Sequence, residues 1–175
     1  KEFFLYPLLI CGVVFTLYQG VLNNEFSGLD DLMMIEENWD QLSSVSHIYT
    51  AFTDDVFHSA QGSYYHTMLI LSYIPDAIIS ASKTPDPSVF FILNIVLFTL
   101  NGVLVFWFLK AFDLNQNYRI IFTLMYVIHP AFTPAVAWVP GRNDTLLTLF
   151  ALGSIWMFIQ FIKSRKKGWI VSHLF

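Results

Sequence analysis

The sequence predicts an all-α fold: a polytopic membrane helix bundle with interfacial helices in its first outer loop. Hydrophobic residues make up 55% of the 175 residues and charged residues only 13%, and the mean hydropathy is +0.56. This composition indicates a lipid bilayer as solvent. Long apolar runs recur along the chain, and basic residues gather at particular ends of them. The single cysteine, Cys11, excludes a disulfide framework and a thiolate metal site within these residues.

The first apolar run, residues 3–22, is uncharged over its whole length. At ~1.5 Å per residue it is long enough to cross a hydrocarbon layer of ~30 Å. A signal peptide is the alternative, but its apolar region spans only ~7–15 residues and ends in a small-residue cleavage site. The sequence VLNNEF that follows offers no such site. We therefore predict a first membrane helix.

Three further spans are predicted at about 89–109, 117–138 and 145–162, and a fifth begins at about 168. Prolines interrupt the third, so its regular helix is expected to end near His129 and leave a bent shoulder. Because the chain begins with Lys and stops in a fresh apolar run, we expect residues 1–175 to be the N-terminal transmembrane module of a longer polypeptide.

Basic residues predict the orientation of the bundle, since short cytoplasmic loops are enriched in them. Lys110 and Arg119 flank the link between the second and third spans, and KSRKK (163–167) follows the fourth. Placing these inside leaves the loop 23–88 and the turn PGRND outside. The segment 64–82 is almost long enough to span, but a Pro-Asp pair interrupts it. We expect interfacial helices there, lying on the outer leaflet with their aromatic side towards lipid.

The loop 23–88 is strongly acidic, and we expect most of its carboxylates to be solvated or to cap helices. Asp30 and Asp31 differ, because they follow the first span closely enough to lie at a lipid head group. Two adjacent, partly desolvated carboxylates cannot both ionise freely, so one can stay charged and act as a general base. The alternative is a turn that starts a helix at the following LMMIEEN.

The turn around Pro140 and Gly141 carries Arg142 on the outer side, against the usual bias. A guanidinium presents a planar fork of donors that fits phosphate oxygens, and the start of the fourth span adds free N–H groups. These features predict phosphate binding. Asp144 is expected to cap the fourth span or to pair with Arg142.

Three other polar residues can be explained by structural roles alone. His129, before Pro130, can simply hydrogen-bond at a helix end. Asn94 and Asn101 are seven residues apart on one helix face, where amides hold membrane helices together.

Four stretches resemble one family: LDDLMMIEEN, GSYYHTM, LNIVLFTLNGVLVF and HPAFTPAVAWVPGRNDTLLTLFALGS. Together they resemble the N-terminal module of GT-C glycosyltransferases, and most closely the tetratricopeptide-containing protein O-mannosyltransferases and their bacterial relatives. The resemblance implies transfer of a sugar, with mannose favoured, from a polyprenyl-phosphate donor to an acceptor hydroxyl. The acceptor would be a protein Ser/Thr or a glycan. The other partner is the lipid bilayer, and no nucleic acid is expected.

The resemblance also implies roles for individual residues. Asp30 would be the base, and Asp31 would orient the acceptor or Asp30 itself. The lipid-linked phosphate would be bound by Arg142, with His66, His129 and Tyr65. Where the family commonly has Tyr-Arg-Pro-Leu, this chain has YHTM, so His66 must be protonated to restore the lost charge. We expect no cofactor, although some relatives use a divalent metal.

Two alternatives to an enzyme remain open: a non-catalytic membrane scaffold subunit, and a transporter of the lipid-linked sugar. A transporter predicts ionisable residues in the middle of the spans, and the span interiors hold almost none. We expect a multi-pass integral membrane protein, of the bacterial inner membrane or alternatively of the endoplasmic reticulum. Residues 1–175 alone are expected to be inactive.

Overall fold

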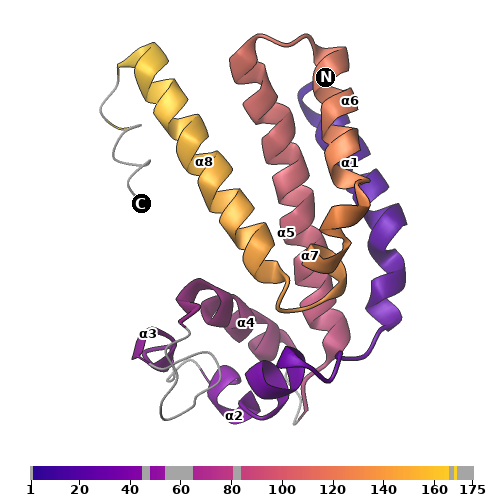
Figure 1. The fold of residues 1–175 in the computed structure, drawn as a ribbon, viewed down its shortest axis with the longest axis vertical. Helices are drawn as coiled ribbons and strands as arrows, with labels where there is room; N and C mark the ends of the chain where they lie inside the picture. Colours follow the sequence, from indigo (N-terminus) through magenta and orange to yellow (C-terminus); the bar gives the residue numbers. More distant parts are fainter. Residues whose placement is uncertain (1, 45–47, 54–64, 81–83, 166–167, 169–175) are drawn as a thin grey trace.

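The computed structural model describes residues 2–44, 48–53, 65–80, 84–165 and 168, and every regular element in these ranges is a helix. This confirms the all-α prediction. Figure 1 shows the long helices running side by side, with short helices gathered where α5 and α8 begin. The elements in chain order are α1 (Glu2–Tyr18), η1 (Gln19–Asn23), η2 (Leu32–Glu36), α2 (Trp39–Leu42), α3 (Thr50–Thr53), α4 (Thr67–Ser80), α5 (Pro87–Phe108), η4 (Leu109–Phe112), α6 (Gln116–Val127), η5 (Pro130–Phe132), α7 (Thr133–Ala137) and α8 (Arg142–Ser164).

Three helical stretches in the described residues are long and apolar enough to cross a membrane: Phe4–Asn23, Pro87–Phe112 and Arg142–Ser164. A fourth candidate is a bent pair, α6 with Pro130–Ala137, whose axes differ by 53°. These stretches overlap the four predicted spans. The predicted fifth span lies outside the described residues, apart from Gly168. The architecture is that of a helical membrane bundle.

Local sequence signals account for the helix boundaries near the turns. The Asp86 carboxylate accepts a hydrogen bond from the backbone N–H of Ser88 at 3.0 Å, and it caps α5 at its N-terminus. Asn115 caps α6 in the same way. The helix α6 ends at Val127 because His129 precedes a proline and is therefore extended, with ψ of 125°.

The helix α5 is central and packs on α1, α6, α7 and α8. At Gly102 a Cβ atom would lie only 2.9 Å from side-chain atoms of both Ile10 and Val127. The missing side chain therefore lets α1 and α6 approach α5 closely. The resulting apolar core joins the three helices.

A second core lies at the end of the bundle where α2, η2 and α4 pack on the start of α5. Tyr73 of α4 is fully buried, and its ring meets that of Phe90 of α5 edge-on, with centroids 5.8 Å apart. Tyr73 therefore does not face lipid, contrary to the expectation for the aromatic side of this segment. One face of α4 packs against the bundle because its apolar residues recur at helical spacing.

Candidate functional site

A pocket of about 170 Å³ opens where α8 begins. Three segments that are distant in the sequence meet around it: the loop before η2, the start of α4 and the turn from α7 to α8. Polar side chains and a few apolar ones form its wall. The lining residues are Asp30, Met34, His66, Leu69, Trp138, Pro140, Gly141, Asn143 and Asp144.

The two adjacent aspartates have different surroundings. Asp31 is buried, at 1% exposure, and one of its carboxylate oxygens accepts hydrogen bonds from the backbone N–H and the hydroxyl of Ser27. Gly28, with φ of 68°, allows the chain to turn back between Ser27 and Asp31. Asp30 is half-buried and lines the pocket. Asp31 thus closes the loop, and Asp30 is the member of the pair that can meet a ligand.

Arg142 lies inside the protein and not on the surface. It is fully buried, and its guanidinium makes an ion pair with Asp76 of α4 at 2.6 Å. It also donates hydrogen bonds to Asn94 Oδ1 at 2.7 Å and to the carbonyl oxygens of Ser72 at 2.8 Å and Phe90 at 2.9 Å. The sequence predicted that this guanidinium binds phosphate, whereas in the structure it faces the interior of the bundle. Since its donors are already engaged, the geometry supports a structural role that ties α8 to α4 and α5.

The network around Arg142 also affects the pKa of nearby acidic groups. Burial raises the pKa of Asp76 to about 6, and the nearby Arg142 charge opposes that rise. Burial also raises the pKa of Tyr73, and the charges of Arg142, Asp31, Asp76 and Asp30 act on the same phenol. The aspartate pair, the buried ion pair and α4 therefore lie within electrostatic range of one another.

The turn that delivers Arg142 is unusually tight. A Cβ atom on Gly141 would lie 2.2 Å from the carbonyl oxygen of Pro134, so only glycine fits. The backbone N–H groups of Arg142, Asn143 and Asp144 bond back to carbonyls three residues earlier, each at 3.1 Å. These N–H groups are therefore not free for a phosphate, contrary to the expectation from the helix start.

The helix α8 begins at Arg142, three residues before the predicted span. Asp144 consequently lies inside the first turn and does not cap the helix, and Asp76 takes its expected place as the partner of Arg142. The Asp144 side chain is exposed on the pocket wall. A carboxylate at this position is favoured by the positive end of the helix dipole.

The other predicted phosphate ligands do not all lie at the same pocket. His66 lines the pocket and is half-buried. Tyr65 is 56% exposed and is not part of the wall. His129 Nδ1 accepts a hydrogen bond from the N–H of Ala131 at 3.2 Å, at the start of η5, so it serves at a helix end.

The two asparagines of α5 are buried and join helices. Asn94 Nδ2 donates to the carbonyl oxygens of Val136 and Trp138, at 3.3 and 3.2 Å. Asn101 Nδ2 donates to the carbonyl oxygen of Thr145 at 2.8 Å. Both contacts fix the turn from α7 to α8 against α5.

Sequence reasoning assigned no functional role to Asp76, Asn143 or Trp138. The signal for Asp76 was a carboxylate inside an apolar helix, because such a charge needs a buried partner. Trp138 lines the pocket, and its indole N–H is buried without a hydrogen-bond partner in the part of the chain that the structure describes.

Chemically, the pocket offers two carboxylates, an imidazole, an amide and an indole N–H. Among the described residues, no group of three or more His, Cys, Asp or Glu side chains is placed to hold a metal ion. Of the described residues that line the pocket, only His66 can carry positive charge. Such a set suits the recognition of hydroxyl groups, since carboxylates accept hydrogen bonds from them.

Comparison with known proteins gives one informative match. The chain is similar to the human protein O-mannosyl-transferase TMTC3, with 28% identity over 164 residues. The matched region is 90% of this chain but only 17% of the length of that relative. No family model matches the chain, and no solved structure matches it. The similarity supports at most a distant relationship to a glycosyltransferase of the GT-C kind.

Proposed function

We propose that this chain forms part of the active site of a membrane glycosyltransferase. The enzyme would move a sugar, with mannose favoured, from a polyprenyl phosphate to a hydroxyl group, most readily that of a protein Ser or Thr. The observation that carries the proposal is the shared pocket of Asp30 and the turn from α7 to α8, at one end of apolar helices. The similarity to an O-mannosyl-transferase agrees with it.

In this mechanism Asp30 is the general base. An acceptor hydroxyl is a weak nucleophile, so a carboxylate must take its proton as the oxygen attacks the anomeric carbon. Asp30 is half-buried and lines the pocket, whereas Asp31 is engaged with Ser27. Asp31 then acts indirectly, by fixing the loop that presents Asp30.

The rest of the wall binds and orients the reactants. Asp144 and Asn143 offer acceptors and donors for sugar or acceptor hydroxyls, and the Trp138 indole N–H can donate to an oxygen. The negative charge that grows on the leaving phosphate needs a positive partner in a dry site. His66 is the candidate for this partner among the described lining residues, because the Arg142 guanidinium is occupied by Asp76.

The test is an Asp30→Asn variant of the intact protein, assayed with a polyprenyl-phosphate sugar and an acceptor peptide in detergent or nanodiscs. The base contributes about 10²–10⁴-fold, so transfer should fall by that factor while the protein stays folded. Asp40→Asn is the matched control, since Asp40 is an exposed carboxylate of the same loop that does not line the pocket. Equal transfer by the two variants would reject Asp30 as the base.

A scaffold function remains the alternative, and the same variants separate the two ideas. A scaffold needs its partners but no proton acceptor. If the wild-type protein transfers no sugar, while Asp40→Asn disrupts a complex that Asp30→Asn leaves intact, the acidic loop is a docking surface and not part of an active site.

A further inference from the structure

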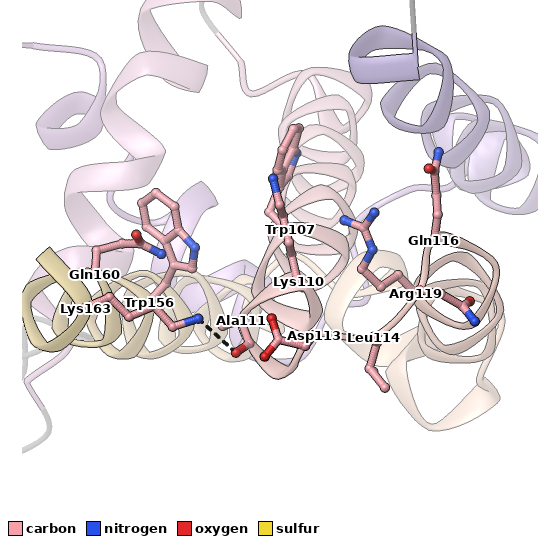
Figure 2. Close-up of a pocket in the computed structure, with 11 residues that line it drawn as sticks. Trp107, Lys110, Ala111, Asp113, Leu114, Gln116, Arg119, Trp156, Gln160 and Lys163 are labelled. Atoms are coloured by element: carbon pink, nitrogen blue, oxygen red, sulfur yellow. Dashed lines mark hydrogen bonds between the residues drawn. The ribbon is translucent and has the colours of Figure 1, made fainter.

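A second and larger recess lies at the opposite end of the bundle from the Asp30 pocket. It encloses about 640 Å³, which is in the range of ligand sites. Figure 2 shows its lining side chains projecting from the end of α5 and the turn after it, from the first turns of α6 and from the last turns of α8. The basic residues predict that this end faces the cytoplasm.

Three cations converge on the recess: Lys110, Arg119 and Lys163. Asp113 is the one carboxylate among the described lining residues, so the formal charge of the wall is +2. In the described part of the chain none of the three cations forms an ion pair with a carboxylate. Lys163 donates instead to the carbonyl oxygen of Ala111 at 3.2 Å, a contact drawn in Figure 2.

Arg119 is held in place by an aromatic ring and not by a carboxylate. Its guanidinium carbon lies 4.7 Å from the centroid of the Phe106 ring, a cation–π contact that fixes its position. Its Nε atom is buried and has no hydrogen-bond partner among the described residues. A buried donor on a guanidinium without such a partner is costly unless a ligand oxygen meets it.

Two tryptophans complete the wall, Trp107 on α5 and Trp156 on α8. Tryptophan is enriched at the level of lipid head groups, where one side of the ring is apolar and the other is wet. Lys110 also lies over the Trp107 ring, with its amine 6.0 Å from the centroid. A recess with aromatic walls, whose cations form no ion pair with a carboxylate among the described residues, fits a phosphate with an attached apolar chain.

We propose that this recess binds the phosphate of an anionic phospholipid from the cytoplasmic leaflet. Arg119 offers its planar fork to two phosphate oxygens, and Lys110 and Lys163 supply further charge. A bound lipid would join α5, α6 and α8 at the end of the bundle opposite the Asp30 pocket. The proposal does not depend on the transfer reaction.

The test measures lipid retention by native mass spectrometry. The intact protein is purified from vesicles of phosphatidylcholine with a minor fraction of phosphatidylglycerol. The wild type should retain phosphatidylglycerol preferentially. Arg119→Gln combined with Lys163→Gln should lower its apparent affinity about tenfold or more, because charge-assisted hydrogen bonds are lost. Arg165→Gln is the matched control, an exposed cation near the end of α8 outside the recess, and it should bind like the wild type.

A second measurement covers variants that fail to fold. A photoreactive benzophenone residue in place of Gln160, on the wall, should cross-link to phosphatidylglycerol in preference to phosphatidylcholine. The same group in place of the exposed Ile162 should label both lipids alike. Equal labelling of the two lipids by the group at position 160 overturns the proposal. So does retention of phosphatidylglycerol that the double variant leaves unchanged. Inorganic phosphate that binds as tightly as the lipid would show that the site takes free phosphate, which also contradicts it.

Discussion

Arg142 and Arg119 lie at opposite ends of the same bundle and differ in what surrounds their charge. Arg142 is fully buried, with a carboxylate, an amide and two carbonyls around it. Arg119 is half-buried, packs on an aromatic ring and has no ion pair among the described residues. The guanidinium of Arg142 is hydrogen-bonded within the fold, whereas that of Arg119 has a donor, Nε, without a partner among the described residues.

The comparison shows that an arginine near a helix end does not reveal its role by its position in the sequence. Both follow a turn and precede an apolar run. The difference comes from α4, which supplies a buried carboxylate at one end of the bundle only. A buried charge needs such compensation, and a charge at the interface can keep its donors for a ligand.

The largest expected effect follows from Arg142→Gln. Removing one member of a buried ion pair leaves Asp76 uncompensated and costs about 3–5 kcal/mol in the free energy of unfolding. Thermal unfolding of the intact protein in detergent measures this loss. Arg119→Gln is the matched comparison, and it should change stability far less.

Comparable destabilisation by these two variants would show that Arg142 is not the internal tie. A double variant, Arg142→Met with Asp76→Leu, sharpens the test. It should recover part of the stability lost by Arg142→Gln, because a buried pair can be replaced by apolar side chains.

A smaller effect is expected from Gly141→Ala, in the turn that delivers Arg142 to its partners. The added methyl group would overlap the Pro134 carbonyl, where a Cβ lies 2.2 Å from the oxygen, so the turn must shift. Overpacking of this kind costs about 1–3 kcal/mol. Gly153→Ala, in an open part of α8 with nothing within 4 Å, is the control and should not destabilise the protein. Equal melting temperatures for the two variants would contradict the close packing of the turn.

The smallest effect is a dependence on pH. Burial raises the pKa of Asp76 to about 6, and the Arg142 charge opposes the rise. The folded chain therefore holds this proton more tightly than the unfolded chain, and the contribution of Asp76 to stability falls as the pH rises through about 6. Arg142→Gln removes the opposing charge, so the pKa rises further and the fall extends to higher pH.

The measurement is the difference in melting temperature between wild type and Arg142→Gln at pH 5 to 8. This difference should grow with pH. In an Asp76→Asn background the growth should disappear, because the titrating group is gone. A difference that stays constant with pH in the original background would mean that Arg142 does not act on Asp76.

Much of the fold could be predicted because long apolar runs and prolines leave few alternatives. The break of the third span at His129 and the extent of α5 follow from local chemistry. The tertiary partner of Arg142 could not be predicted, since Asp76 is 66 residues away in the sequence and only the packing of α4 brings them together. For the same reason the sequence could not distinguish Asp30 from Asp31. In the structure Asp31 is hydrogen-bonded to Ser27 and buried, whereas Asp30 lines the pocket.

The most direct test of the account asks whether the start of α4 and the turn from α7 to α8 meet at the pocket that Asp30 also lines. Cysteines in place of His66 and Asn143, in a cysteine-free background of the intact protein, should be joined by a short bifunctional thiol reagent. The pair Asp40→Cys with Asn143→Cys, in which Asp40 does not line the pocket, should not be joined. Cross-linking of the control pair but not of the first would contradict the shared pocket, and with it the site proposed for transfer.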